Sequence, residues 1–291
     1  MPEQRAGPHA TVIRELLVRY LDTWTPLVLR AHRTATYIDA GNADLASAAI
    51  RVFGEFTDRL AGHQLDVVML APSTPLTGPD PPPGLTLRPV RHLTDITVTG
   101  PALAHLDIDT GTVDEAAAWQ LVAALTPGKA REILFTLPPT APGHVLDHRA
   151  RLHAAGLTQA VTVELVDNQQ HARLLIFATA DPKHLTLFKD ELWAADEFAG
   201  IRYRDPHDPD HTLIDIAINP QLLPLRHALL TELARRGSCT AAELQHHTEQ
   251  HTIYRPADTL RALTAAAAAG HITREPAKGR MAPRTIVRHH E

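Results

Sequence analysis

Three side chains near the middle of the chain could converge on a metal ion. His105, Asp107 and Asp109 alternate in the segment AHLDIDT, and the two-residue period of a strand puts all three on one face. The sequence offers no identifiable fourth ligand beside them. We therefore expect an exposed strand face near a loop, and no metal site.

A second trio of residues lies further along at helical spacing. In ELQHHTEQH, the residues Glu243, His247 and His251 recur on one helix face, a geometry able to hold a metal. Their order is not the HExxH of zinc proteases. A solvated helix face explains this pattern, and we predict no metal here either.

The stretch TATYIDAGNADLASAAI, at residues 34–50, indicates nucleotide chemistry. Apolar and β-favouring residues lead to Asp39, Gly41 follows, and the chain becomes an Ala-rich helical run. A glycine in such a turn lets backbone N–H groups approach a cofactor that a Cβ would push away. Only the lone Gly41 lies where a nucleotide pocket would need a glycine-rich turn.

The elements that must position these residues alternate in type. A helix with an apolar period opens the chain, and Pro26 interrupts it. Strands are predicted at 35–38 and 65–70 with a helix over 44–61 between them, and the proline-rich stretch 71–89 reads as a long loop. Further strand and helix patterns end in a strand pair, AVTVELV and ARLLIFATA. This alternation predicts an α/β sheet with covering helices.

The chain beyond residue 220 has a different pattern. Three helical runs, with Gly237 and Gly270 as stop signals, precede two short strands around a basic loop. This order is that of a winged helix-turn-helix. We therefore predict two domains, an α/β domain at 1–220 and a winged helix at 221–291.

Composition narrows the classes of protein that are possible. The 291 residues carry a net charge of −5; the part 222–291 has 10 Lys and Arg against 6 Asp and Glu, a net +4, which leaves −9 for the rest. Such asymmetry is typical of a region that meets an anionic partner. The single Cys239 excludes an internal disulfide and a Cys-based metal cage. Without a long apolar run or a signal peptide, the protein is predicted to be cytoplasmic.

Long phrases at both ends of the chain resemble the three-Cys-motif partner (TcmP) family of bacterial proteins. The opening phrase is RELLVRYLDTWTPLVLRAHRTATYIDAG, and the later ones are RLLIFATADPKHLTLFKDELWAADEFAGIRYRD, LLPLRHALLTELARRGSCTAAELQHHT and TIYRPADTLRALTAAAAAGHI. The resemblance implies a methyltransferase-like Rossmann domain followed by a winged helix. It also implies a partner protein with three clustered cysteines.

The family's cofactor loop is matched only in part. Asp39 and Gly41 agree with its pattern, and the resemblance implies that they are vestigial cofactor-binding residues. Asn42, Ala43 and Asp44 replace the rest of a Gly-Pro-Gly type loop. These side chains would occupy space that the cofactor's backbone contacts need. We therefore expect a narrowed pocket.

Two strand ends also depart from the expected pattern. The second strand leads into Ala71, where nucleoside-binding folds commonly offer a carboxylate to the ribose. The strand LFTLPPT, taken as the fourth, has Leu137 where the family's pattern resembles an Asp before Pro. We therefore predict a non-catalytic pseudo-methyltransferase with no catalytic residue and no cofactor, which binds a partner protein and could also bind nucleic acid. Two alternatives stay open: an active S-adenosylmethionine-dependent methyltransferase, and a ligand-sensing DNA-binding regulator.

Seven basic side chains are candidates for nucleic-acid or partner binding. Two lie on the third helix of the last domain and five in its hairpin: Arg255, Arg261, Arg274, Lys278, Arg280, Arg284 and Arg288. A helix in the major groove with a basic wing on the phosphates would need this arrangement. The third helix, however, reads LTAAAAAG and offers no base-reading side chain on that face, which favours protein docking.

Overall fold

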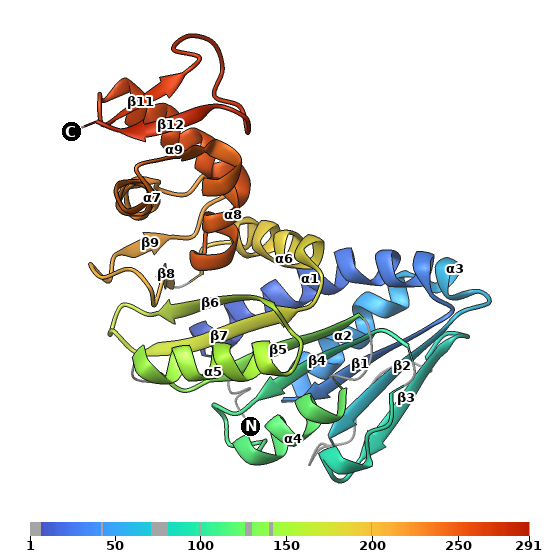
Figure 1. Ribbon diagram of the computed structural model, residues 1–291. Helices are drawn as coiled ribbons and strands as arrows, with labels where there is room; N and C mark the ends of the chain where they lie inside the picture. Colours follow the sequence, from blue (N-terminus) through green and yellow to red (C-terminus); the bar gives the residue numbers. More distant parts are fainter. Residues whose placement is uncertain are drawn as a thin grey trace.

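The computed structural model describes residues 7–41, 43–70, 81–98, 100–125, 130–139, 142–198 and 200–290. Figure 1 shows a large sheet between layers of helices, with the last part of the chain stacked at one end of it. None of the described helices combines the length and the apolar character needed to cross a bilayer.

The large sheet combines parallel and antiparallel strands. Five strands pair in parallel: β1 (Thr34–Ala40), β2 (Gln64–Leu70), β3 (Leu85–Val90), β4 (Ala102–Asp107) and β5 (Arg131–Leu137). Four more join by antiparallel pairing: β6 (Gln159–Val166), β7 (Ala172–Thr179), β8 (Arg202–Arg204) and β9 (Leu213–Asp215). The strand order is β3-β2-β1-β4-β5-β7-β6-β8-β9. The 3-2-1-4-5 part is the order of doubly wound sheets, and the antiparallel β7 beside β5 makes this a methyltransferase-like Rossmann fold.

Helices bury both faces of this sheet. One face is covered by α1 (Pro8–Ala31), α2 (Ala43–Glu55), α3 (Thr57–Leu60) and α6 (Pro182–Ala194). The other is covered by η1 (Leu93–Asp95), α4 (Glu115–Leu125) and α5 (Pro142–Ala154). Successive strand residues alternate between the two apolar clusters, as Tyr37 and Ile38 do. Burial on both faces explains why the strands are almost continuously apolar.

Two helix predictions need correction. Pro26 does not interrupt the first helix, because α1 continues to Ala31. A proline costs a helix about 3 kcal/mol, and the fully buried Leu21 and Trp24 and the buried Val28 on the same helix offset it. The helix predicted over 44–61 is divided at Phe56 into α2 and α3.

The predicted loop over 71–89 also needs correction. Residues 71–80 lie outside the described part of the chain, but Leu85–Val90 forms β3 at the edge of the sheet. An edge strand tolerates Pro89, because one side of it needs no ladder hydrogen bond. The fourth strand is therefore β4, and the segment taken as the fourth strand in the sequence is β5.

The last part of the chain forms a smaller unit of three helices and three strands within the described residues. Its elements are α7 (Leu223–Arg236), β10 (Ser238–Thr240), α8 (Ala241–His251), α9 (Pro256–Ala268), β11 (Ile272–Glu275) and β12 (Ile286–His289). The strands pair in the order β10-β12-β11. Gly237 ends α7 with φ 77, and Thr240 with Glu243 forms a capping box at the start of α8. The three helices and the hairpin agree with the sequence prediction, whereas β10 was not predicted.

A buried lysine connects this unit to the sheet domain. Lys189 on α6 is fully buried, and its Nζ donates to four backbone carbonyls at and beyond the end of α8. These acceptors are Thr248 O at 3.2 Å, Glu249 O at 2.6 Å, Thr252 O at 2.7 Å and Tyr254 O at 3.0 Å. The C-terminal carbonyls of α8 are thereby satisfied by a side chain of the other unit.

Candidate active site

The strand order of the sheet reverses between β1 and β4. In open α/β sheets ligands bind in the crevice outside the carboxyl ends of the strands, at such a reversal. Asp39 of β1 pairs in register with His105 of β4, and β4 ends at Asp107. The structure therefore brings the two candidate regions Asp39–Gly41 and His105–Asp109 together at one sheet edge.

Asp39 is a buried carboxylate that holds the turn after β1. Its Oδ2 accepts the Tyr37 hydroxyl at 2.7 Å, and its Oδ1 accepts the Gly41 N–H at 2.9 Å. Burial, with the charge and hydrogen bond of Asp39, raises the pKa of Tyr37 well above its ordinary value, so this phenol stays a donor. Asp39 thus fixes the backbone of the turn rather than facing open space.

Gly41 is required by the crowding at this turn. A Cβ at this position would lie 2.9 Å from His105 Cε1 and 3.1 Å from Asp39 Oδ1. Both neighbours are buried, so neither can move away freely. The sequence predicted a glycine that admits a cofactor; here the same absence of a Cβ also admits His105.

His105 is a fully buried imidazole between the two acidic strand ends. Its Nδ1 lies 3.7 Å from Asp39 Oδ1, and its Nε2 lies 3.3 Å from Thr136 Oγ1. Burial lowers the pKa of His105, but the nearby negative charge of Asp39 outweighs burial, and the net pKa is raised. The imidazole therefore links β1, β4 and β5.

Asp107 and Asp109 line a cavity of about 200 Å³ at the end of β4. Asp107 accepts the Thr110 N–H at 3.3 Å and the Thr110 hydroxyl at 3.1 Å. Asp109 pairs with Arg173 Nε at 2.6 Å, and burial raises the pKa of Asp109 although Arg173 opposes the shift. The cavity therefore has both acidic and basic groups in its wall.

Neither sequence trio forms a metal site in the described residues. His105 is directed to Asp39 and Thr136, while Asp109 pairs with Arg173. In the helical trio, Glu243 caps α8 through Thr240, and the rings of His247 and His251 lie 4.9 Å apart.

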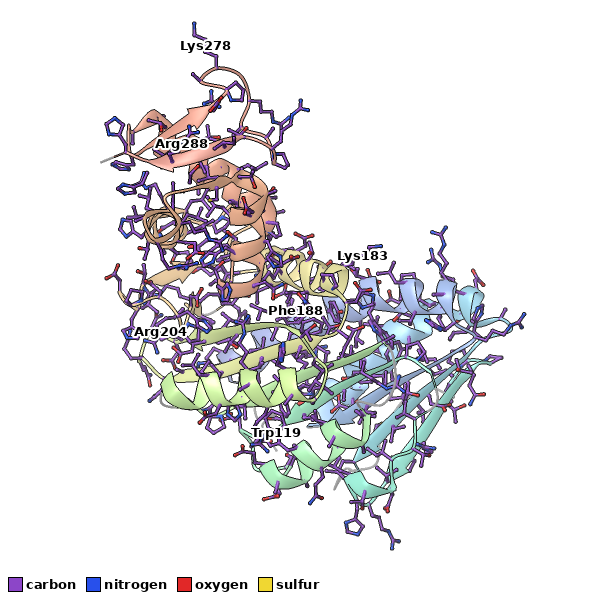
Figure 2. All side chains as sticks on the ribbon, in the orientation of Figure 1. Trp119, Lys183, Phe188, Arg204, Lys278 and Arg288 are labelled. Atoms are coloured by element: carbon purple, nitrogen blue, oxygen red, sulfur yellow. The ribbon has the colours of Figure 1, made fainter. Side chains whose placement is uncertain are left out.

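A second cavity at the same sheet edge was not predicted from the sequence. It has about 270 Å³ and is lined by Ile108 and Pro138, which follow β4 and β5, and by side chains of α4 and α5. Trp119 stacks on His148 at 5.7 Å, and the Arg151 guanidinium lies 3.9 Å from the Trp119 ring centroid. Figure 2 labels Trp119 on α4. The i, i+3 spacing of His148 and Arg151 was a signal for a shared helix face, but nothing in the sequence pairs that face with Trp119.

Of the seven basic candidates, four are engaged in contacts within the chain. Arg255 and Arg261 pair with the buried Asp258, at 2.9 and 3.2 Å. Arg274 donates to Gly279 O at 2.8 Å, and Arg288 lies 3.4 Å from Glu275. The other three are exposed in the hairpin loop: Lys278, Arg280 and Arg284. Figure 2 shows Lys278 at the tip of the hairpin, directed away from the rest of the molecule.

Comparison with known proteins gives structural likeness only. No family model and no curated protein matches the chain. One similar structure is magnesium protoporphyrin IX methyltransferase from Synechocystis PCC 6803 with bound SAH, at 13% identity and TM-score 0.38, covering 61% of this chain and 90% of that one. Another is a 16S rRNA (adenine(1408)-N(1))-methyltransferase mutant from Catenulisporales acidiphilia, at 16% identity and TM-score 0.34, covering 56% and 93%.

The expectation of a non-catalytic binding protein without a cofactor is corrected here. The similar structures include a methyltransferase solved with SAH and with SAM. The physical reason for the error lies in the strand count. Because β3 was read as loop, the acid was sought at Leu137 on β5, whereas β4 ends in Asp107. Other residues also depart from the family's cofactor pattern. Of these, Asn42 and Ala71 lie outside the described residues, and Asp44 is exposed.

Proposed function

We propose that the chain is an S-adenosylmethionine-dependent methyltransferase whose cofactor binds at the carboxyl ends of β1 and β4. One observation carries the proposal: Asp107 ends β4 beside the crowded Gly41 turn of β1, at the point where the strand order reverses. The arrangement supplies an acid and a glycine turn on adjacent strand ends.

The residues present fit this cofactor in chemical type. Arg173 and Asp107, both in the wall of the cavity, offer opposite charges to the carboxylate and the ammonium of an amino acid. The described cavity of about 200 Å³ is smaller than the roughly 300–1,000 Å³ of typical ligand sites. It accommodates the charged amino-acid end of such a cofactor, and the nucleoside needs space beyond it.

The chain's own groups would hold the substrate and move a proton. When bound, S-adenosylmethionine supplies a methyl group on a sulfonium. Asp109, whose pKa burial raises, is suited to accept a proton from the nucleophile that is methylated. The second cavity shares this strand end through Ile108 and offers a substrate the side chains of His148 and Arg151.

Calorimetric titration with S-adenosylhomocysteine tests the proposal. The wild-type chain is expected to bind S-adenosylhomocysteine. Asp107→Asn keeps the shape of the side chain and removes its charge, and this variant is expected to bind about tenfold more weakly. A tenfold change in affinity corresponds to a loss of about 1.4 kcal/mol of binding free energy. Asp215→Asn is the matched control, because Asp215 is exposed on β9, at the far edge of the sheet. Absence of binding by the wild-type chain, or equal affinities of the two variants, would contradict the proposal.

For the C-terminal unit we propose a winged helix-turn-helix that docks on a protein partner, and membership of the whole chain in the three-Cys-motif partner family. The order of α7, α8 and α9 followed by the β11–β12 hairpin supports the first part. Arg255 and Arg261 are already paired with Asp258, so their guanidinium groups are not available for phosphates. This pairing supports docking on a protein over binding of nucleic acid.

A charge reversal at Arg280 and Arg284 tests this docking. Both side chains are exposed, so folding is expected to be unchanged. Loss of co-purification with a partner that has clustered cysteines supports docking. If the double variant instead weakens nucleic-acid binding and lowers the salt slope by about 2, one for each phosphate contact, nucleic acid is the partner and docking is wrong.

A further inference from the structure

A cavity of about 670 Å³ lies between the sheet domain and the C-terminal unit. Its walls come from the loop between β8 and β9, from α7 and from the end of α8 with the turn after it. Its lining residues are distinct from those of the two cavities at the carboxyl ends of β4 and β5. Its volume lies within the roughly 300–1,000 Å³ of small-molecule sites.

The loop wall of this cavity is acidic. Asp205 is buried and accepts the Ile253 N–H at 3.0 Å, and Asp208 accepts the Thr212 N–H at 2.9 Å. Asp210 is exposed, with its nearest ion-pair partner, His227 Nδ1, at 3.9 Å. No Lys or Arg is among the described residues that line the cavity. A negative field therefore acts inside it.

A fourth carboxylate of the cavity is already neutralised. Glu232 on α7 binds Arg235 at 2.8 Å and Arg236 at 2.5 Å, and these hydrogen bonds lower the pKa of Glu232 to about 2. The uncompensated charge is therefore concentrated on the β8–β9 loop, on one side of the cavity.

The helical wall is largely apolar. Pro224, Leu225, Ala228 and Leu230 of α7 line it. At the end of α8, burial lowers the pKa of His247, and burial with the neighbouring charge of His247 lowers the pKa of His251 to about 4. Both rings are neutral at pH 7, so they add no positive charge to offset the acidic loop.

We propose that this cavity binds a small organic cation, with an ammonium group against Asp208 and Asp210 and an apolar body against α7. Anionic ligands such as nucleotides are disfavoured, because their charge would meet Asp208 and Asp210, and neither carboxylate has a Lys or Arg ion-pair partner among the described residues. The ligand would join the loop of the sheet domain to α7 of the C-terminal unit. The inference does not depend on methyl transfer.

Three probes that share an indole ring test the charge preference. Tryptamine carries an ammonium, tryptophol is neutral and indole-3-propionate is an anion at pH 7.5. We expect tryptamine to bind at least about tenfold more tightly than indole-3-propionate in calorimetric titration, since one favourable charge contact of about 1.4 kcal/mol gives that ratio. Tryptophol is expected between them. Equal affinities, or no binding by tryptamine, would overturn the proposal.

Two variants locate the binding. Ala228→Trp fills the cavity from α7 and is expected to abolish tryptamine binding, whereas Ala234→Trp, on an exposed part of the same helix, is the matched control. Asp210→Asn removes an exposed charge without disturbing the core and is expected to reduce the preference for tryptamine over tryptophol. Unchanged binding by Ala228→Trp or an unchanged preference in Asp210→Asn would show that the cation binds elsewhere.

Discussion

Lys189 makes the stability of the protein depend on pH in a range where few other groups titrate. Burial lowers the pKa of Lys189 to about 7 from its ordinary 10.5, although nearby acidic groups oppose the shift. The unfolded chain therefore binds a proton between pH 7 and 10.5 that the folded chain does not. Stability must then rise with pH across this window, by about 1.4 kcal/mol per pH unit.

Replacement by Met isolates this effect. Lys189→Met keeps most of the side-chain volume and removes the ammonium donor from three carbonyls, those of Glu249, Thr252 and Tyr254, at about 1 kcal/mol each. Thr248 O keeps the N–H and the hydroxyl of Thr252 as donors. The substitution also removes the cost of burying the ammonium, about 5 kcal/mol for the shift from 10.5 to about 7. Near pH 7 the variant is therefore expected to be the more stable by about 2 kcal/mol, and this difference shrinks as pH rises.

Urea unfolding at pH 7.5 and 8.5 measures the difference. We expect the wild-type chain to gain about 1.4 kcal/mol over this interval and Lys189→Met to gain almost nothing. Lys183→Met is the control, because Lys183 is exposed at the start of the same helix (Figure 2). The raised pKa values of Cys239 and the buried tyrosines affect the wild-type chain and the variant alike, so the difference between the two curves reports Lys189. Parallel curves for wild type and Lys189→Met would refute the reasoning.

Three further predictions concern single side chains. The hydrogen bond that His184 donates to Glu132 raises the pKa of His184, so the pair stabilises the fold below pH 6.5 and this contribution is lost as pH rises through the raised pKa. His184→Gln is expected to lose about 1–2 kcal/mol more stability at pH 6 than at pH 8 in urea unfolding. Gly41→Ala forces a Cβ against His105 and is expected to lower stability by about 1–3 kcal/mol, measured by calorimetry. Thr240→Ala removes the cap of α8 and is expected to cost about 1 kcal/mol, measured in the same way, whereas an unchanged midpoint would show that the cap is not needed.

Local signals explain which parts of the fold were predictable. The C-terminal helices were found because Gly237 and Thr240 mark their ends with residues that the backbone requires there. The parallel strands β1 and β2 were found because burial on both faces makes them continuously apolar. Three-residue strands such as β8 and β10 have too few residues to show a period, and pairing alone defines them.

Contacts between distant residues were not predictable. The buried Glu132 accepts hydrogen bonds from the Trp24 indole N–H, at 3.1 Å, and from the Tyr20 hydroxyl. Its carboxylate also lies 2.5 Å from His184 Nδ1. These four residues belong to three elements, and no spacing in the sequence relates them. A buried carboxylate needs such partners, but the sequence does not show that Glu132 is buried.

The candidate site depends on strand order more than on any motif. The prolines of the stretch 71–89 made Leu85–Val90 read as loop, yet at the edge of a sheet Pro89 leaves the ladder on the inner side of β3 intact. One missed strand moves every later strand by one position, so the end of β5 at Leu137 was taken for the end of β4. With the order established, Asp107 lies beside the turn that Asp39 and Gly41 form. Asp107, which the sequence presented only as one of three alternating polar residues, thereby becomes the residue on which the proposed methyl transfer is tested.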